Sequence, residues 1–264
     1  MAEAGGNGSG YLLEARGITK YFGAVTALRD VNFHLLRGEV LGVVGDNGAG
    51  KSTLMKILSG LYQPSSGELL FEGGPAAFTS PRDARGKGIE MVYQDFALAG
   101  NMPIYENIYL GREPGLRLPG LTIVDRARSR AMAQAHLDKL KIHVKSVDQN
   151  VEDLSGGQRQ AVAIARSTAF DARIVIMDEP TAALAIKEVG KVLDLIKGLK
   201  DHGVGVILIS HRMDDIFYVC DRVMALFQGT NFAEAPLKDT SRNEVIGWIM
   251  GAKGHREALA HDKV

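Results

Sequence analysis

The sequence predicts an α/β fold built on a mostly parallel β-sheet, with a helical subdomain inserted into it. Short β-branched runs with the length of buried strands recur along the chain and alternate with amphipathic helical stretches. A glycine-rich loop joins one such run to a helix. The stretch of about residues 95–170 departs from this alternation, because prolines interrupt its first half and its second half is helical in composition. Strands that alternate with helices favour a sheet covered on both faces.

The first part of the chain is predicted to be mainly strands. Val40–Val44 is a β-branched run bounded by glycines, which is typical of a buried strand. The spacing of Leu54, Ile57 and Leu58 places them on one face of a helix. The other predicted elements of this part are the helix Lys51–Gly60 and the strands Tyr11–Ile18, Val31–Leu35, Gly67–Glu72 and Gly88–Tyr93.

The middle of the chain predicts a helix over Asp125–Lys141, and the alternation of strands and helices then returns. The predicted helices are Gly156–Ala169, Lys187–Asp201, Met213–Cys220 and Ser241–Met250, and the predicted strands are Ile174–Met177, Val204–Ile209 and Arg222–Phe227. We expect one domain over residues 11–251. The Gly and Ser content of residues 1–10 predicts a flexible leader, and residues 252–264 are expected to form a polar tail.

Composition excludes several classes of protein. The 31 Lys and Arg residues balance the 31 Asp and Glu residues, so no overall basic footprint for nucleic acid is present and no nucleic-acid partner is expected. Cys220 is the one cysteine, which rules out an intramolecular disulfide and fits a reducing cytosolic setting. No apolar run approaches the roughly 18 residues that span a bilayer. We therefore expect a soluble protein whose contact with a membrane is peripheral.

The glycine-rich loop matches the pattern G-x-x-x-x-G-K-[ST] of phosphate-binding loops. Glycines let successive backbone N–H groups converge on phosphates, and the start of the following helix adds partial positive charge. Lys51 is expected to reach the β- and γ-phosphates, and Ser52 to offer its hydroxyl to Mg²⁺. A glycine-rich turn that matches by chance is the alternative, but the strand before and the helix after favour a nucleotide. The predicted nucleotide-binding residues here are Gly45, Asp46, Asn47, Gly48, Ala49, Gly50, Lys51, Ser52 and Thr53.

Two carboxylates end the apolar strand that begins at Ile174. Asp178 can hold Mg²⁺ through its water shell, and Glu179 beside it can act as a general base toward the attacking water. Carboxylates at the end of a buried strand are costly unless a cation lies near them, and bound MgATP supplies that cation. A surface turn that carries two ordinary acids is the alternative.

Residues 154–158 read Leu-Ser-Gly-Gly-Gln, ahead of a predicted helix and upstream of the acidic strand. This pentapeptide resembles the signature of ATP-binding-cassette (ABC) ATPases, and the resemblance extends from about Leu12 to about Gly251. It implies a P-loop NTPase core of the ABC ATPase type, with an inserted helical subdomain and N-terminal antiparallel β-strands. It also implies ATP and Mg²⁺ as cofactors.

The signature residues lie at the start of a helix, which is a natural anion site. The resemblance implies that Ser155, Gly156, Gly157 and Gln158 contact the γ-phosphate of an ATP bound to a second copy of the chain. Two ATP molecules would then be buried in a head-to-tail homodimer. A simple N-capped helix with Ser155 as the cap is compatible with this role.

Three further positions match the family one by one. Phe22, directly before Gly23, fits the aromatic residue that stacks on adenine, with Tyr21 as the alternative. Gln94 fits the glutamine that contacts Mg²⁺ and links the core to the helical subdomain. His211 fits the histidine that contacts the γ-phosphate. The implied catalytic residues are therefore Lys51, Gln94, Glu179 and His211, and the implied metal ligands are Ser52, Gln94 and Asp178.

One position departs from the family pattern. Where the family often has Ser-Ala-Leu-Asp after the acidic strand, this chain has Ala-Ala-Leu-Ala, so Ala185 replaces the aspartate. That aspartate commonly takes part in communication between the two ATP sites. The details of that communication are therefore open, whereas the residues implied in hydrolysis are all present.

Several stretches are similar to bacterial monosaccharide-import ATPases, those of fructose importers included: Ser80–Ala84, Val92–Asp95, Glu106–Glu113 and Thr181–Leu184. The likeness implies a peripheral protein at the cytoplasmic face of the bacterial inner membrane. Its partners would be transmembrane permease subunits and, indirectly, a periplasmic sugar-binding protein. A soluble or exporter-associated ABC ATPase is the alternative. A P-loop kinase of a small molecule would have no use for the signature pentapeptide.

The segment Asp95–Glu113 follows Gln94 and corresponds to the place where importers of the family dock their membrane subunits. Its apolar residues are Phe96, Leu98, Met102, Ile104 and Tyr105. Some of them are expected to line a groove for a short helix of the membrane subunit. The alternative is that they form the small core of the helical subdomain.

Overall fold

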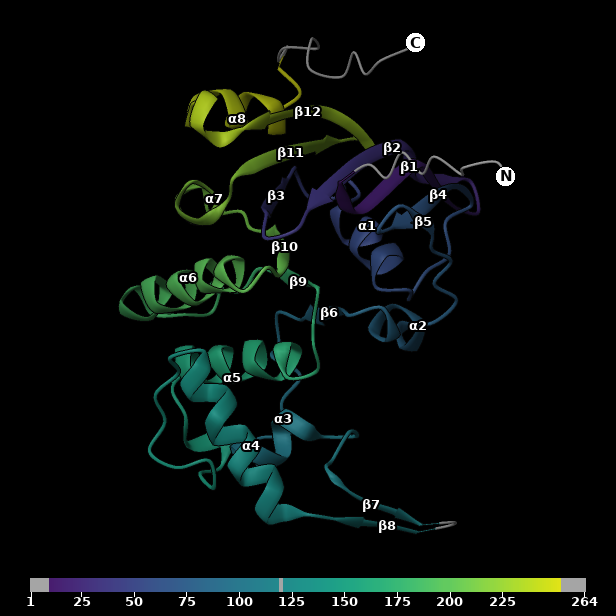
Figure 1. Ribbon diagram of the computed structural model, residues 1–264. Coiled ribbons are helices and arrows are strands. Elements are labelled where there is room, and N and C mark those ends of the chain that lie inside the picture. Colours follow the sequence, from purple (N-terminus) through teal and green to yellow (C-terminus); the bar gives the residue numbers. More distant parts are fainter. Residues whose placement is uncertain (1–9, 119–120, 253–264) are drawn as a thin grey trace, which may run out of the picture.

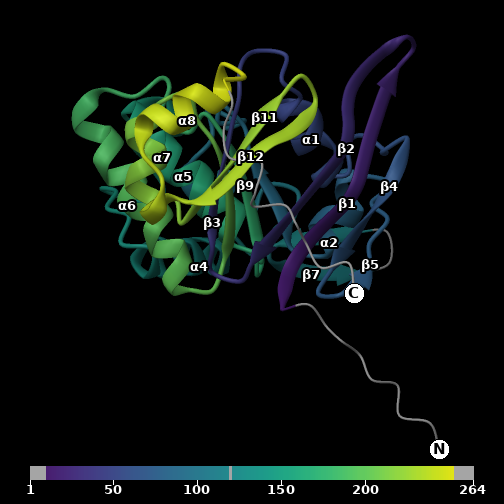
Figure 2. The ribbon, with the colours of Figure 1, turned by 90° about the horizontal axis from the view of Figure 1, so that it is seen from above.

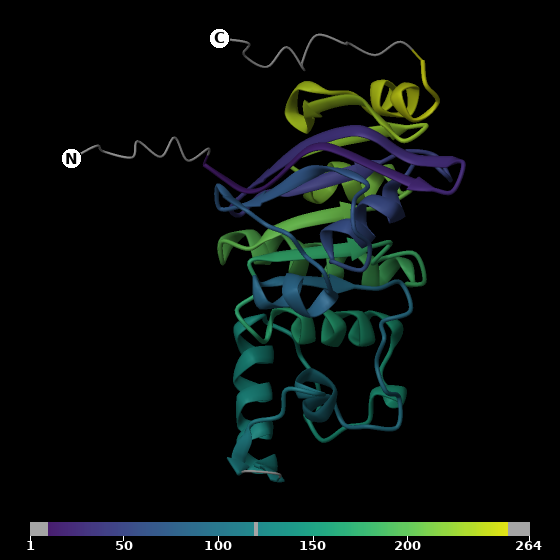
Figure 3. The ribbon, with the colours of Figure 1, turned by 90° about the vertical axis from the view of Figure 1, so that its right-hand side faces the viewer.

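The computed structural model describes residues 10–118 and 121–252. Apart from Gly10 and Ala252, the predicted leader and the predicted tail lie outside these residues. Figure 1 shows two β-sheets in the upper part of the molecule and the helices α3 (Ile104–Tyr109), α4 (Arg126–Lys139) and α5 (Gly156–Thr168) below them. Figure 3 shows the same stacking from the side.

The central sheet has six strands among the described residues, in the order β12-β11-β3-β10-β9-β6. The strands are β3 (Val40–Val44), β6 (Ile89–Val92), β9 (Ile174–Asp178), β10 (Gly205–Ile209), β11 (Arg222–Phe227) and β12 (Thr230–Pro236). All neighbouring pairs are parallel except β11 and β12, which form an antiparallel hairpin. The mostly parallel sheet is thus confirmed, but β12 was not predicted, because its mixed sequence lacks the continuous apolar run of a buried strand.

Alternate residues of each central strand pack against different layers, as strand geometry requires. In β10, Ile207 and Ile209 pack with helix α1 (Lys51–Leu58) and the N-terminal strands. Val206 and Leu208 pack instead with α6 (Ile186–Asp201), α7 (Met213–Val219) and α8 (Arg242–Ile249). Figure 2 shows these two layers on opposite sides of the strands.

The N-terminal strands form a second, antiparallel sheet of order β2-β1-β4-β5. Its strands are β1 (Tyr11–Phe22), β2 (Val25–Leu36), β4 (Ser66–Phe71) and β5 (Gly74–Pro75). The predicted antiparallel strands are confirmed, but β1 and β2 are longer than expected. The register of the pairing between β1 and β2 shifts several times after Ala15. The sequence of these strands therefore lacks the regular alternation of apolar and polar residues that would predict their full length. The side-chain amide of Asn231 joins the two sheets, since it exchanges hydrogen bonds of 2.7 and 2.8 Å with the backbone of Asn32.

The helical part has its own apolar core. Side chains of α3, α4 and α5 pack together in it, with Ile108, Leu137 and Val162 among the buried residues. The predicted helix over Asp125–Lys141 is confirmed, and Asp125 caps its start by accepting a 2.9 Å hydrogen bond from the backbone N–H of Arg128. Helix α5 packs against both this core and the core beside α6, so it joins the helical part to the sheet.

Two features of the helical part were not predicted. Helix α3 begins directly after Pro103, a proline position that a helix start tolerates but that appeared as a break in the sequence. An antiparallel hairpin of β7 (Gly115–Leu118) and β8 (Leu121–Val124) follows and projects from the lower end of the molecule in Figure 1. The remaining short helix, α2 (Pro81–Gly86), lies beside β6. Within the described residues, no helix has the length and apolarity needed to cross a membrane.

Candidate functional site

The loop of residues 45–50 connects β3 to α1, and three of its glycines have positive φ angles. A Cβ atom at Gly45 would lie 2.4 Å from the carbonyl oxygen of Leu226, and one at Gly50 would lie 2.6 Å from Cδ2 of Leu28. At Gly48, with φ of 82°, a Cβ would have no heavy atom within 4 Å. Packing therefore requires glycine at positions 45 and 50. At position 48 there is room for a side chain, and glycine is favoured there by the positive φ angle alone.

Lys51, the first residue of α1, is buried, with 7% of its surface exposed. Its Nζ donates hydrogen bonds to the carbonyl oxygens of Gly45 at 2.7 Å and Asp46 at 3.0 Å. The ammonium group therefore lies across the loop. Burial lowers the pKa of Lys51, and the carboxylates of Glu179 and Asp178 oppose this effect.

The other loop residues differ in exposure. Ser52, Asp46 and Asn47 are exposed, Thr53 is half-buried and Ala49 is buried. The side chain of Asp46 accepts a 2.7 Å hydrogen bond from the backbone N–H of Asn47, which fixes the outer part of the loop.

The acidic pair lies at the end of β9, two strands away from β3 in the sheet. Burial raises the pKa of Asp178, with Lys51 as the largest opposing influence. Burial also raises the pKa of Glu179, and His211 is its largest opposing influence. Because burial disfavours both ionised carboxylates, an added cation would be stabilising at this end of the strand.

Glu179 faces His211 across the ends of β9 and β10. Oε1 of Glu179 lies 3.3 Å from Nε2 of His211, is buried, and has no hydrogen-bond partner. The backbone N–H of Glu179 donates a 3.0 Å hydrogen bond to the carbonyl oxygen of Ile209, and its φ of 51° is rare for a residue with a side chain. The imidazole of His211 is 54% exposed and the side chain of Glu179 only 12%, so the histidine covers a largely buried carboxylate.

Four predicted residues therefore converge where neighbouring parallel strands end. Lys51 comes after β3 and its loop, His211 comes after β10, Asp178 ends β9 and Glu179 follows it. We call Lys51, Asp178, Glu179 and His211 the strand-end cluster. Ligands of open α/β sheets bind at this edge of the sheet.

Gln94 lies after β6, the strand beside β9, and is exposed on the same edge. No hydrogen bond or ion pair within the described part of the chain joins it to the strand-end cluster. Phe22 lies at the end of β1 and is 43% exposed. Its ring contacts that of Tyr62 in an edge-on arrangement with centroids 5.4 Å apart. Tyr62, which follows α1, was not predicted, since a single aromatic residue in a loop carries no distinctive signal.

The signature segment, Ser155–Gln158, begins α5. Ser155 caps the helix, and its side chain and that of Gln158 form reciprocal hydrogen bonds of 3.3 and 3.1 Å with the backbone. A Cβ at Gly157 would lie 2.7 Å from Cβ of Glu188 in α6, so this position requires glycine. The hydroxyl of Ser155 and the N–H of Gly157 lower the pKa of Glu188, which lies against the segment.

The structure does not bring the signature segment to the strand-end cluster. Within the described residues no hydrogen bond or ion pair connects them. Each of the two predicted phosphate-contacting regions is therefore described by its own contacts: Ser155 and Gln158 bond within the start of α5, and Glu179 contacts His211.

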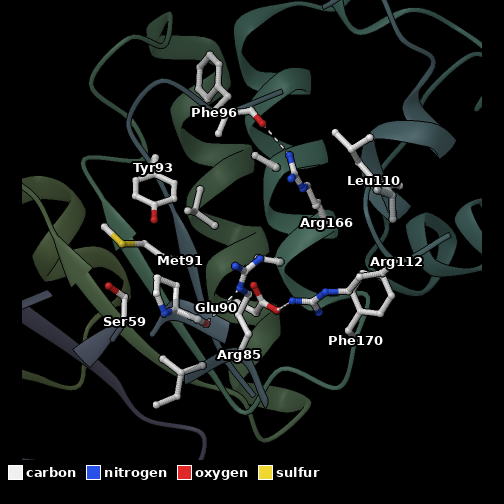
Figure 4. A pocket seen from close by; sticks show the side chains of 17 residues that line it. Ser59, Arg85, Glu90, Met91, Tyr93, Phe96, Leu110, Arg112, Arg166 and Phe170 are labelled. Atoms are coloured by element: carbon white, nitrogen blue, oxygen red, sulfur yellow. Dashed lines mark hydrogen bonds and ion pairs between the residues drawn. The ribbon is translucent and has the colours of Figure 1, made fainter. Parts of the chain in front are cut away.

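A pocket of about 300 Å³ lies beside the segment that follows β6 (Figure 4). Arg166 of α5 reaches across it and donates a 2.7 Å hydrogen bond to the carbonyl oxygen of Ala97. Arg112 forms a 2.8 Å ion pair with Glu90. Burial lowers the pKa of Arg166, and the nearby Arg112 and Arg85 add to this effect. The pocket thus combines a positively charged wall with apolar surface.

The five apolar residues predicted in this segment divide into two groups. Ile104 and Tyr105 are buried in the core of the helical part, which is the alternative that the sequence left open. Phe96 lines the pocket, and Leu98 is partly buried against two cores. Met102 is half-buried. Tyr93 and Leu110 also line the pocket, and they were not among the five predicted residues.

Comparison with known proteins identifies the family of the chain. Residues 28–182 match the family described as ABC transporter. The chain is 44% identical to the fructose import ATP-binding protein of Rhizobium meliloti over 94% of this chain and 98% of that protein. It is also 44% identical to the xylose/arabinose import ATP-binding protein of Sulfolobus acidocaldarius, over 89% of this chain and 92% of that protein.

A third relative is a ribose import ATP-binding protein of Streptomyces coelicolor, at 39% identity over 95% of this chain. This chain spans about half of that protein, since the match covers 49% of it.

Two solved structures extend the comparison. An ATP-binding cassette of an ABC transporter in its ADP conformation is 26% identical, with a TM-score of 0.78 over 91% of this chain and 99% of that one. A dimeric bacterial ABC transporter cassette is 27% identical, with a TM-score of 0.71 over 86% of this chain and all of that one.

The parallel sheet, the phosphate loop and the carboxylates at the strand ends define a P-loop ATPase. The further match of the signature segment places it in one branch of that class. The chain belongs to the ABC transporter family and is one of its ATP-hydrolysing cassettes.

Proposed function

We propose that this chain is the ATP-hydrolysing subunit of an importer that takes up a monosaccharide, at the cytoplasmic face of a bacterial inner membrane. The observation that carries the proposal is the 44% identity to a fructose import ATP-binding protein over nearly the whole of both chains. Relatives named for xylose/arabinose and ribose import widen the substrate class to fructose and related sugars. The choice among sugars would belong to the membrane subunits and to a periplasmic binding protein.

The phosphate loop and the strand-end cluster fit MgATP. The backbone N–H groups of the loop and the ammonium of Lys51 would hold the β- and γ-phosphates. The hydroxyl of Ser52, the carboxylate of Asp178 and the amide oxygen of Gln94 are oxygen donors of the kind that Mg²⁺ prefers. Bound Mg²⁺ would neutralise phosphate charge and relieve the cost of the buried carboxylates. Phe22 and its neighbour Tyr62 would offer the adenine an aromatic surface.

Glu179 is the proposed general base. Its buried, unpartnered Oε1 can accept a proton from the attacking water while the bond between the γ-phosphorus and the leaving oxygen breaks. His211 lies 3.3 Å from that oxygen and would orient the carboxylate and contact the γ-phosphate. The pKa of Glu179, raised by burial, makes the carboxylate a stronger base than an exposed glutamate.

A second copy of the chain would complete each site. The signature segment lies apart from the strand-end cluster of its own chain, and one structural relative is a dimeric cassette. In a head-to-tail dimer with two-fold symmetry, Ser155, Gly156, Gly157 and Gln158 of one chain would contact the γ-phosphate held by the other.

The pocket beside Phe96 is the proposed docking groove for a short helix of the transmembrane permease subunits. It lies between β6, which leads to Gln94, and α5, which carries the signature segment. A partner seated there would contact both regions that meet the nucleotide.

Reconstitution with the candidate permease and binding protein tests the proposal. Vesicles that contain the complex are expected to take up a monosaccharide from a sugar panel in an ATP-dependent manner. Lys51→Ala should abolish uptake and weaken ATP binding in a direct titration, whereas Lys145→Ala, an exposed control, should change neither. Phe96→Asp should leave hydrolysis by the isolated subunit intact and prevent assembly with the permease. ATP hydrolysis without uptake of any sugar on the panel would contradict the importer assignment and favour the soluble or exporter-associated alternative.

A further inference from the structure

We infer that Asp215 is a positioning residue: it holds Glu179 and His211 opposite each other by bridging the two loops that carry them. The inference rests on the proposed function, because it concerns the same hydrolytic site. It adds a residue from the first turn of α7 that the sequence analysis did not select.

Asp215 is 1% exposed, and both of its carboxylate oxygens have partners. Oδ2 accepts a hydrogen bond from the hydroxyl of Thr181, which is itself fully buried. Oδ1 lies 3.4 Å from Nε of Arg212. Thr181 is two residues after Glu179 and Arg212 is one residue after His211, so one carboxylate touches both loops.

The neighbouring Asp214 is a useful comparison, because it is an exposed aspartate in the same helical turn. It also lies in the first turn of α7, where a negative charge is favourable, but its side chain is 73% exposed and pairs with the exposed Arg242. Asp215 is the next residue of the same turn and faces the interior, where it is buried with Ile216 and Val219. Burial of a carboxylate costs several kcal/mol unless its partners compensate, so the bridge to Thr181 is the feature that accounts for an acid here.

Glu179 depends on this support. Its Oε1 has no hydrogen-bond partner, its backbone φ is 51°, and its contacts toward His211 all come from the residue that the Asp215 bridge helps to place. The hydrogen bond from its N–H to Ile209 ties the start of its loop to β10. The contact between Thr181 and Asp215 ties the end of that loop to the segment behind His211. The contact of Arg212 is weaker, since that side chain is 41% exposed.

Loss of the bridge should misplace the base rather than the nucleotide. A shift of about 1 Å in a reacting group costs about a hundredfold in rate. ATP itself would be held by the loop of residues 45–50, by the start of α1 and by Phe22, whereas the polar partners printed for Asp215 among the described residues are Thr181 and Arg212. We therefore expect Thr181→Val, which removes the hydroxyl at almost constant shape, to lower kcat by about ten- to a hundredfold with little change in KM for ATP. Thr181→Ser restores the hydroxyl and should restore kcat, and Asp214→Asn is the matched control.

A double variant separates positioning from stability. Thr181→Val alone leaves a buried carboxylate short of a partner and should lower the melting temperature of the full-length chain. In Thr181→Val/Asp215→Leu both partners are apolar, so the melting temperature should recover while kcat stays low. Recovery of kcat together with the melting temperature would overturn the inference, and so would a kcat for Thr181→Val equal to that of the parent.

A readout independent of activity separates this inference from the proposed function. In the parent chain, Glu179→Gln should shift the NMR signals of the His211 ring, because the two side chains are in contact. In the Thr181→Val background the same substitution should have little effect on that ring. If the coupling is unchanged, the bridge is not what holds the pair together, whether or not the chain hydrolyses ATP. If the parent shows no ATPase activity but the coupling is lost as expected, the proposed function fails and the bridge stands.

Discussion

The strand-end cluster and the signature segment are the two regions expected to meet the γ-phosphate, and they are built in opposite ways. The cluster gathers charged side chains from three neighbouring strands, and burial shifts the pKa values of Lys51, Asp178 and Glu179 toward their neutral forms. The signature segment is a capped helix start, with Ser155 exposed and Glu188 of the same chain against it.

This difference indicates which ligand each region is expected to bind: MgATP held by the same chain for the cluster, and a phosphate held by a second chain for the signature segment. The cluster carries an electrostatic cost in the isolated chain that MgATP would relieve. The signature segment carries no comparable cost, because the side chains of Ser155 and Gln158 cap the helix start within the chain itself. On our proposal the two regions are half-sites, which a second chain would join in a head-to-tail dimer.

The largest expected effect falls on the cluster. Glu179→Gln keeps the shape of the side chain but cannot accept a proton, so the ATPase rate should fall by about 10²- to 10⁴-fold. ATP affinity in a direct titration should be retained, because Lys51 and the loop are unchanged. Glu68→Gln, an exposed glutamate of β4, is the control and should behave like the parent. Near-normal turnover by Glu179→Gln would show that Glu179 is not the general base.

A smaller effect distinguishes two aromatic residues at the edge of the nucleotide site. Phe22→Ala should raise KM for ATP by about tenfold, since stacking of a base on an aromatic ring contributes about 1–3 kcal/mol. Tyr21→Ala should have little effect, because it is Phe22 whose ring pairs with that of Tyr62. Steady-state kinetics at several ATP concentrations measure both. A larger rise in KM for Tyr21→Ala than for Phe22→Ala would show that Tyr21, and not Phe22, stacks on the adenine.

The smallest effect is on stability and follows from the raised pKa of Glu179. A carboxyl whose folded pKa lies above its unfolded value stabilises the fold when protonated, and that contribution is lost as the pH rises through the folded pKa. At neutral pH the ionised carboxylate therefore destabilises the nucleotide-free chain. Glu179→Gln should raise the melting temperature by a few degrees near pH 7 and have little effect near pH 4. An equal change at both pH values would show that ionisation is not the cause.

The sequence predicted three of the four members of the strand-end cluster from a local signal, whereas His211 was selected only through the family resemblance. Lys51 lies in a loop pattern with steric and electrostatic reasons for each glycine, and Asp178 and Glu179 interrupt an apolar strand where charge needs an explanation. The parallel order of the sheet then brings them together, since the same ends of the strands meet at one edge.

The features that the sequence did not predict depend on tertiary contacts. Tyr62 contributes to the site because its ring contacts that of Phe22, which lies 40 residues earlier in the chain. The role of Asp215 depends on its burial against Thr181, which lies 34 residues earlier in the chain. Arg112, which follows α3, and Arg166 of α5 meet at the pocket only in the folded chain, so no sequence pattern joins them. Ile104 and Tyr105 were candidates for the groove, and the structure places them in a core.

The central claim is that the two half-sites meet only across two chains, and the mass of the Glu179→Gln variant in light scattering tests it most directly. The variant should bind ATP without hydrolysing it, so MgATP should shift its mass from that of one chain to that of two. Adding Ser155→Arg, which places a bulky side chain at the start of α5, should return the mass to that of one chain while ATP binding persists. A mass that stays at one chain with saturating MgATP, or a dimer that Ser155→Arg leaves intact, would contradict the account.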